Sequence, residues 1–366
     1  MQTFSARPID PDQLLAAHAV LLEHAKGRLF PSDAAEALGV SELDLLAARA
    51  GVDATRLELR LEPLFQTLAT LGPVKAITRN AHAVLEVVGP WTGLDLGPHH
   101  GLVIGGPIDL RLFPRRFAYA FAVDATVRGR RSRSIQFYGP DGVAVHKVFL
   151  VEASDADAFA RLVEAQRSSD TSRTVDVVAA PAPTVAAEPA PAVDRAALES
   201  GWRAMTDPHQ YHGLLARHGL SRRQAVDLVP RDLARRVPET AVREVLEGAR
   251  ELDIPLMVFV GNQGCIQIHT GPLERIVASG GWLNVLDPVV DLHVREDSID
   301  AVFAVRKPAE EGRWVSSLEI FSADGTICAT LFGARKPGID ELPEWRELCR
   351  SLVPYESARK PAQAAP

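Results

Sequence analysis

The chain has 366 residues, a hydrophobic content of 46% and a formal net charge of −7 at pH 7. This length exceeds that of one ordinary hydrophobic core, so we expect two domains. The acidic balance argues against a general nucleic-acid-binding protein, and the lack of any run of eighteen apolar residues argues against a membrane-embedded one. An N-terminus without a secretory pattern and three cysteines without zinc-site spacing favour a cytoplasmic location.

The first half of the chain is predicted to place helices before strands. Residues 11–58 are predicted to be helical, with Ser32 and Ser41 as N-caps. The middle helices raise the alternative of a DNA-reading helix-turn-helix, which their acidic side chains disfavour because they would repel phosphates. Over residues 74–151, short β-branched and aromatic segments separated by turn residues predict strands. A predicted helix over 153–168 closes this half.

A Pro- and Ala-rich stretch separates the two halves and is predicted to be a semi-rigid linker. Beyond it the first pattern returns: the Asp-Leu pair at 109 recurs 182 positions later, and the Asp-Gly turn at 141 recurs 183 positions later. The chain is therefore predicted to be a tandem duplication of one α+β unit, with N-terminal helices followed by a mostly antiparallel β-sheet. The predicted parts are a first repeat (1–167), the linker (168–196), a second repeat (197–353) and a disordered tail (354–366).

The segment that follows the linker concentrates the candidate chemistry. His209 follows an Asp-Pro turn and starts a predicted helix, and guanidinium groups come soon after it. No phosphate-binding, hydrolase or metalloprotease motif occurs in the chain. A planar anionic ligand that carries a metal, such as haem, needs an imidazole for its iron, cations for its carboxylates and apolar surface for its faces. The chain offers such groups at His209, His212, Arg222, Arg223, Lys307, Arg335, Tyr211, Phe303, Phe321 and Phe332. Taken singly, each is equally typical of a helix cap, a core position or a solvated surface.

Longer motifs carry a resemblance to a known family. They include VKAITRN from residue 74, SIQFYGPDGVAVHKVF from 134, WRAMTDPHQ from 202 and VGNQGCIQIHTG from 260. From about residue 12 to 352, except for the linker, the chain resembles the HemS/ChuS/PhuS family of cytoplasmic hemin-binding proteins, also called hemin-degrading factors. The resemblance implies a tandem fold in which haem b (iron protoporphyrin IX) lies in a cleft between elements of the two halves.

The resemblance also implies roles for individual residues. His209 matches the axial ligand of the haem iron, and Arg111 matches an arginine on the opposite face of the ring. Three basic residues, Arg222, Lys307 and Arg335, match positions that contact the propionates and the pocket.

Three further positions affect which of the family's residue roles can be assigned to this chain. Phe332 stands where some relatives carry a tyrosine, so a polar contact to the pocket would be missing. His212 lies one helical turn after His209 and is an alternative ligand during transfer, with a structural or surface histidine as the competing interpretation. The segment around His82 differs from relatives with a further histidine in the first copy, so no second haem site is expected there.

Two functions remain open on the sequence. In the favoured one, the protein receives hemin from an inner-membrane haem importer and delivers it to a downstream haem oxygenase for iron release. In the alternative, it is itself a haem-degrading enzyme that opens the porphyrin ring with an external electron donor, and Arg111 acts on the distal face. The chain has no flavin or nicotinamide motif, which favours binding and delivery.

Overall fold

The computed structural model describes residues 10–25, 29–178, 193–335 and 339–358. The chain forms two compact units, each of which includes a short piece from the other half of the sequence. Unit 1 comprises residues 1–79, 86–181 and 261–267, and unit 2 comprises residues 80–85, 182–260 and 268–366. None of the helices in the described ranges is both long and apolar enough to cross a membrane.

Unit 1 begins with three helices whose ends follow local capping chemistry. Ser41 caps the third helix in a capping box with Asp44, as the sequence predicts. The prediction that Ser32 caps the second helix is wrong, because Phe30 occupies the N-cap position and Pro31 fills the first turn, where its missing N–H costs nothing. The helices of this unit are α1 (Pro11–His24), α2 (Pro31–Leu38), α3 (Glu42–Ala47), α4 (Leu61–Leu68) and α5 (Ala156–Gln166).

The main sheet of unit 1 is antiparallel, with strand order β1-β7-β8-β9-β2. The predicted strands are present, but residues 54–57, predicted to be helical, form the short strand β1. Burial alternates along β2, so one face of the strand points into the core. The strands in the first half of the sequence are β1 (Ala54–Leu57), β2 (Pro73–Arg79), β3 (Ala83–Pro90), β4 (Leu94–Leu96), β5 (Gly101–Val103), β6 (Asp109–Leu112), β7 (Tyr119–Val127), β8 (Arg130–Tyr138) and β9 (Ala144–Leu150).

Unit 2 repeats this arrangement with sheet order β10-β16-β17-β18-β11. Each of these strands corresponds to the strand at the same place in the unit 1 order. The predicted duplication of a helices-then-sheet unit is therefore confirmed. Its helices are α6 (Arg195–Arg203), α7 (Gln210–His218), α8 (Arg222–Leu228), α9 (Ala241–Glu251), α10 (Pro343–Ser351) and α11 (Tyr355–Ala358). Its strands are β10 (Ala234–Val237), β11 (Leu256–Gly261), β12 (Cys265–Gly271), β13 (Ile276–Ser279), β14 (Trp282–Leu286), β15 (Val290–Arg295), β16 (Ile299–Pro308), β17 (Trp314–Ser322) and β18 (Ile327–Gly333).

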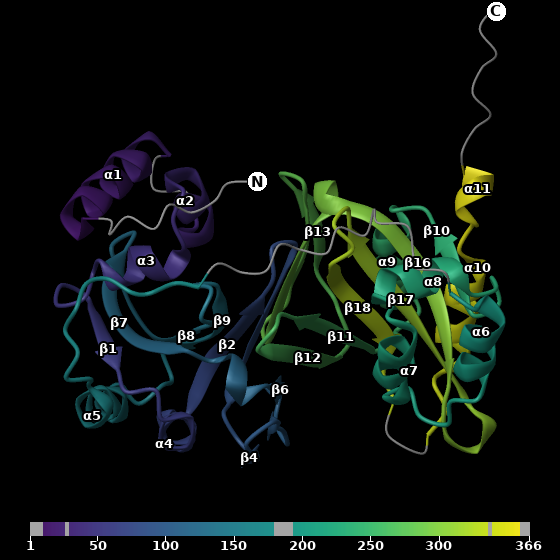
Figure 1. Cartoon of the computed structure of the whole chain (residues 1–366), viewed down its shortest axis with the longest axis horizontal. Helices are drawn as coiled ribbons and strands as arrows, with labels where there is room; N and C mark the ends of the chain where they lie inside the picture. Colours follow the sequence, from purple (N-terminus) through teal and green to yellow (C-terminus); the bar gives the residue numbers. More distant parts are fainter. Residues whose placement is uncertain (1–9, 26–28, 179–192, 336–338, 359–366) are drawn as a thin grey trace, which may run out of the picture. The chain divides into compact units, whose positions relative to one another are not determined.

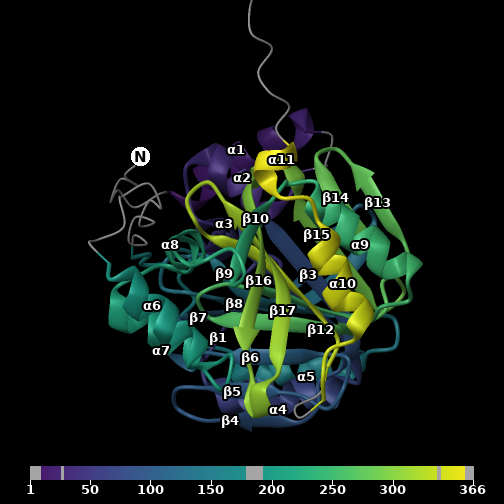
Figure 2. The same ribbon diagram turned by 90° about the vertical axis from the view of Figure 1, so that its right-hand side faces the viewer.

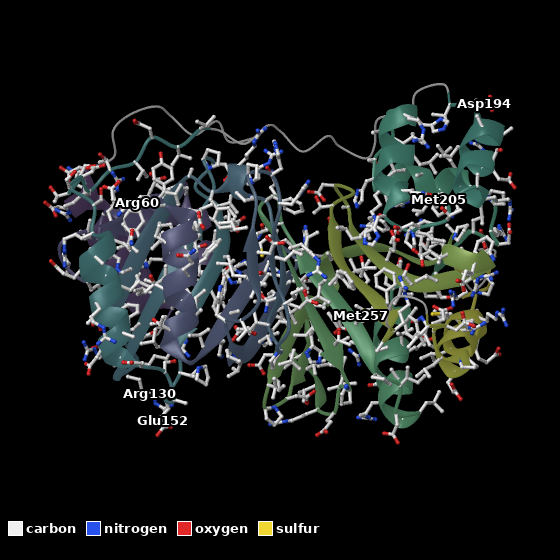
Figure 3. The ribbon with its side chains drawn as sticks, turned by 90° about the horizontal axis from the view of Figure 1, so that it is seen from below. Arg60, Arg130, Glu152, Asp194, Met205 and Met257 are labelled. Carbon is white, nitrogen blue, oxygen red and sulfur yellow. The ribbon has the colours of Figure 1, made fainter. Side chains whose placement is uncertain are left out.

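Helices α6, α7 and α8 pack on one face of the unit 2 sheet (Figures 1 and 2). Asp194 caps the start of α6, and Met205 lies buried just after its end (Figure 3). The core between the layers is built on Trp202 and Tyr211, whose ring centroids lie 4.7 Å apart. The Trp202 indole N–H also donates to the carbonyl of Arg306 in β16, at 2.9 Å. This packing fixes the turn between α6 and α7.

Parts of the predicted semi-rigid linker and of the predicted disordered tail are ordered. Residues 168–178 belong to unit 1 and pack within it: the Tyr119 hydroxyl donates to the carbonyl of Asp176 at 2.7 Å, and Arg173 Nε donates to the carbonyl of Ala48 at 2.9 Å. The first residues of the predicted tail form α11, which places the Tyr355 ring 4.1 Å from the Arg236 guanidinium. The rest of the predicted linker up to residue 192, and residues 359–366, lie outside the described residues.

Candidate functional site

His209 stands at the N-cap of α7 with its ring presented to solvent, since 92% of the side chain is exposed. The preceding Asp-Pro turn holds it there. Asp207 Oδ1 accepts a hydrogen bond from the His209 backbone N–H at 2.8 Å and lies 2.6 Å from Nδ1 of the ring. The backbone N–H of His209, together with its ring, lowers the pKa of Asp207. The carboxylate is therefore ionised at neutral pH and accepts the Nδ1 proton.

This arrangement suits a metal ligand. A ring nitrogen that donates to a carboxylate fixes the tautomer, so that the other nitrogen, Nε2, carries the lone pair. The Nε2 of His209 makes no hydrogen bond within the described residues. Asp207 thus orients His209 and leaves its Nε2 without a hydrogen-bond partner among the described residues.

His212 lies on α7 one turn after His209, on the same side of the helix. Its ring is also accessible to solvent. Partial desolvation lowers its pKa, and the positive charges of Arg222 and Lys307 lower it further. The imidazole is thus neutral near pH 7, which is the form that binds metals. The structure therefore places two imidazoles on one helix face, with two cations near His212.

These two cations share one buried carboxylate, Glu319 of β17. Arg222 approaches it side-on, with Nε 3.0 Å from Oε2 and Nη2 3.4 Å from Oε1, and the Lys307 ammonium donates to Oε1. Burial by itself would raise the pKa of Glu319, but the two cations hold it well below its usual range. Burial lowers the pKa of Lys307 to about 8. At pH 7 the group Arg222–Lys307–Glu319, called the cation cluster below, therefore carries a net charge of about +1.

The members of the cation cluster differ in their access to solvent. Lys307 is 3% exposed and lies over the Tyr211 ring, with Nζ 4.5 Å from the ring centroid. The Arg222 side chain is 28% exposed, and its Nη1 has no hydrogen-bond partner within the described part of the chain. Arg222 can therefore contact an external anion directly, whereas Lys307 would act mainly through its charge. The propionate roles implied for both residues stay predictions.

Phe332 and Arg335 lie at and just beyond the end of β18. The partly buried Phe332 ring packs edge-on against Phe259, with centroids 5.0 Å apart. The positive charge of Arg335 contributes to the lowered pKa of Asp207, so it lies near the turn that carries His209. The structure thus gathers four predicted residues, His209, His212, Arg222 and Lys307, around the start of α7, with Arg335 close by.

Two other arginines have different surroundings. Arg223 is largely buried, pairs with Asp227 and lies over the Phe303 ring at 4.9 Å, so it serves the packing of α8 on the sheet. Arg111 lies in β6 of unit 1, where it pairs with Asp109 and donates to the carbonyl of Leu110 at 3.2 Å. Its implied place on the face of a haem stays a prediction.

Sequence reasoning missed two functional candidates, Asp207 and Glu319. The Asp-x-His spacing could have identified Asp207, because an aspartate two residues before a helix start often bonds the following backbone N–H. No local signal marks Glu319, since its burial results from the helices packed on β17.

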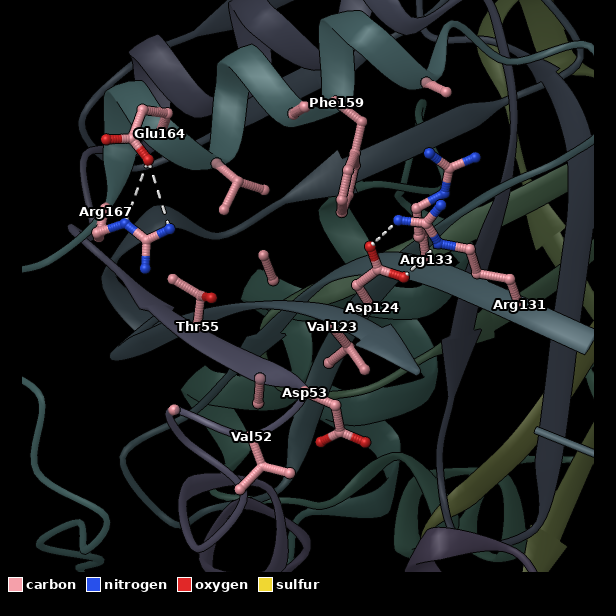
Figure 4. A pocket seen from close by; sticks show the side chains of 16 residues that line it. Val52, Asp53, Thr55, Val123, Asp124, Arg131, Arg133, Phe159, Glu164 and Arg167 are labelled. Carbon is pink, nitrogen blue, oxygen red and sulfur yellow. Dashed lines mark hydrogen bonds and ion pairs between the residues drawn. The ribbon is translucent and has the colours of Figure 1, made fainter. Parts of the chain in front are cut away.

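Unit 1 contains an open groove of about 570 Å³ between α5 and strands β1, β7 and β8 (Figure 4). None of the predicted site residues lines it. Its charged side chains are largely paired with one another: Arg131 with Asp124 at 2.6 Å, and Arg167 with Glu164 at 3.4 Å. The groove therefore offers no concentration of unpaired charge comparable to the start of α7.

Comparison with known proteins gives one consistent result. Residues 39–166 and 219–352 match the protein family described as the haemin-degrading HemS.ChuX domain. The hemin transport protein HmuS of Yersinia pestis is 38% identical over 325 residues, which cover 88% of this chain and 93% of the relative.

Solved structures agree with this match. Apo-PhuS, a heme-binding protein from Pseudomonas aeruginosa, superposes with a TM-score of 0.89 at 42% identity, over 94% of this chain and 100% of that one. The heme degrading enzyme ChuS from Escherichia coli O157:H7 superposes with a TM-score of 0.87 at 35% identity and the same coverage. On its matched segments, its relatives and its duplicated fold, the chain belongs to the HemS/ChuS/PhuS family.

Proposed function

We propose that this chain binds haem b through the Nε2 atom of His209 and acts as a cytoplasmic carrier that receives imported hemin and delivers it for iron release. The observation that carries the proposal is the exposed His209 ring, oriented by Asp207 and lying close to cationic side chains. Imidazole is a common ligand of haem iron, and cations complement the ring's carboxylates. Relatives described as a hemin transport protein and a heme-binding protein support it.

Delivery is favoured by how His209 is held. The ring is bonded to Asp207 and packs against little else, so a ligand on Nε2 remains open to solvent from one side. His212 offers a second imidazole on the same helix face, which suits the handover of a metal from one ligand to another. Under this proposal the partners are an inner-membrane haem importer and a downstream haem oxygenase.

A second function, haem degradation, has one observation in its favour. The related ChuS is described as a heme degrading enzyme and shares the fold over 94% of this chain. In that case an external donor would supply electrons, and the haem would be substrate. The two functions separate in one experiment: the haem complex is incubated with ascorbate while catalase removes peroxide. Haem that keeps its Soret band supports the carrier, and haem that is lost with release of iron supports the enzyme.

Binding itself is tested by titrating the protein with hemin and following the Soret band. His209→Ala is expected to shift or abolish the band while circular dichroism stays unchanged. His218→Ala, at the other end of α7, is the matched control and is expected to behave as the unmodified protein. A His209→Ala spectrum identical to that of the unmodified protein would remove His209 as the ligand.

A further inference from the structure

The two copies of the duplicated unit differ at one set of three positions. In both copies a serine capping box starts the helix before the first strand: Ser41 for α3 and Ser221 for α8. The next residue is Glu42 in unit 1 and Arg222 in unit 2. The same helix start therefore carries opposite charge in the two copies.

The strand registers identify the other two positions. Phe121 pairs with Gln136 across β7 and β8, as Phe303 pairs with Glu319 across β16 and β17, so Gln136 is the counterpart of Glu319. Val123 and Val305 each pair with the first alanine of the neighbouring edge strand. Two residues further along lie Ala125 and Lys307, which are therefore counterparts. The cation cluster of unit 2 thus corresponds to Glu42, Ala125 and Gln136 in unit 1.

Unit 1 shows that the fold forms without buried ions at the two strand positions. The Gln136 amide donates to Ser134 Oγ at 2.9 Å and accepts from the Tyr138 hydroxyl at 2.7 Å, which satisfies this part of the core with neutral groups. Buried ion pairs are in general weak contributors to stability, because desolvation offsets their attraction. The three charges of unit 2 are therefore not required by the architecture, and a ligand-related role explains why they occur together.

The geometry indicates what that role is. Glu319 binds the Nε and Nη2 side of Arg222, which fixes the guanidinium plane and leaves Nη1 for another acceptor. Lys307 bonds the same carboxylate from the interior and balances its charge. Without Glu319, the partly exposed Arg222 would be free to rotate and to extend into solvent. With it, one guanidinium edge is held near His212 and a net positive charge lies beneath it.

We propose that Glu319 is a positioning residue: it holds Arg222 so that the site recognises a carboxylate at the edge of the ligand that His209 binds. The role of Lys307 is to balance Glu319, so that the buried carboxylate does not cancel the charge of Arg222. This inference rests on the proposed function, since it takes the ligand to be a ring with carboxylates. It predicts that the site distinguishes haem from a haem whose carboxylates are blocked.

The test compares haem with its dimethyl ester, which keeps the iron and ring but has no ionised propionate. Both are titrated in the same detergent, and the ratio of their affinities measures carboxylate recognition. The unmodified protein is expected to prefer haem by about tenfold, the value of one charge-assisted hydrogen bond. Arg222→Gln and Glu319→Gln are each expected to remove most of this preference, and the double variant is expected to lose no more than either alone. Ester binding and the Soret position should stay unchanged, because His209 is intact.

A charge-free variant, Arg222→Gln, Lys307→Ala and Glu319→Gln together, guards against misfolding, since alanine and glutamine are the residues that unit 1 carries at the two strand positions. It is expected to fold, to bind the ester and to show no preference for haem. Equal affinities of the unmodified protein for haem and ester would overturn the inference, and so would Glu319→Gln with an unchanged preference. Failure of the unmodified protein to bind either compound would instead refute the proposed function, and this inference with it.

Discussion

The hydrogen bond between Asp207 and His209 gives the most direct prediction about the site. Asp207→Asn keeps the size of the side chain and an oxygen that can accept from Nδ1, but it removes the negative charge. The 2.6 Å separation between Asp207 Oδ1 and Nδ1 is short, as expected for a hydrogen bond to a charged acceptor. The substitution therefore weakens the bond that orients the ring without removing His209, the proposed iron ligand.

The size of the effect follows from the difference between two kinds of hydrogen bond. A bond to a charged group contributes about 1.5–3 kcal/mol and a neutral one about 0.5–1.5 kcal/mol. The Asp207 side chain is 42% exposed, so solvent screening places the loss at the low end, about 1 kcal/mol. We expect haem affinity to fall by about five- to tenfold for Asp207→Asn. Asp207→Ala also removes the bond to the backbone N–H, and we expect a loss of about 10- to 100-fold.

The assay is a hemin titration at pH 7.5 followed at the Soret band, with circular dichroism to check the fold. The band position should not change in Asp207→Asn, because the proposed ligand, His209, is still present. Asp232→Asn is the control, since it removes a charge that pairs with Arg203 in the same unit. If both Asp207 variants bound haem with the affinity of the unmodified protein while His209→Ala did not, the orienting role of Asp207 would be refuted.

Three further predictions concern other parts of the chain. Burial lowers the pKa of His146 to about 3, so as pH falls below about 6.5 the unfolded chain takes up a proton that the folded chain does not. The free energy of unfolding should then fall by about 1.4 kcal/mol per pH unit from this group, and urea denaturation of His146→Gln should show a correspondingly flatter pH dependence between pH 6.5 and 5. Trp202→Ala should lower the free energy of unfolding by about 3–5 kcal/mol in the same assay, because it leaves a cavity at a fully buried core position. Arg111→Ala should weaken haem binding or change the spin state, and an identical titration and spectrum would leave Arg111 as a partner of Asp109 alone.

Much of the architecture could be predicted from the sequence because it depends on local patterns of residues. The start of α7 at His209 follows from an Asp-Pro turn, and the capping box of Ser41 from its spacing to Asp44. The duplication is visible because turn residues keep a constant spacing across the two halves. Strand β1 was not predicted, since four residues at a sheet edge, Ala54–Leu57, are too short to show a period.

The charged part of the site could be predicted only in part. A motif can assign a ligand role to His209 or a cation role to Arg222, since both match single positions of a family pattern. The same pattern says nothing of the Glu319 carboxylate, whose environment is made by residues from α8 and β16. Nor could it show that Lys307 is buried. Alternation along β16 predicts on which face of the sheet a side chain lies, but not whether other elements cover that face.

The helices before the first strand show why duplication of a sequence need not duplicate a site. In unit 2, α6 packs on β16 through Trp202. This contact holds the end of α6 in place, and the turn that contains His209 follows it. In unit 1 the corresponding helix α1 instead joins α2 and α3 in a separate apolar cluster, which also takes in Leu29. The region of β7 contacts residues 168–178 through Tyr119. By the register of the two serine capping boxes, Leu29 stands at the position of His209 and packs against the apolar cluster, and Glu42 stands at the start of the following helix. Each copy has its own sheet of the same strand order, but among the described residues the exposed imidazole and the cation cluster occur together in unit 2, which is where we propose that an anionic metal-bearing ring binds.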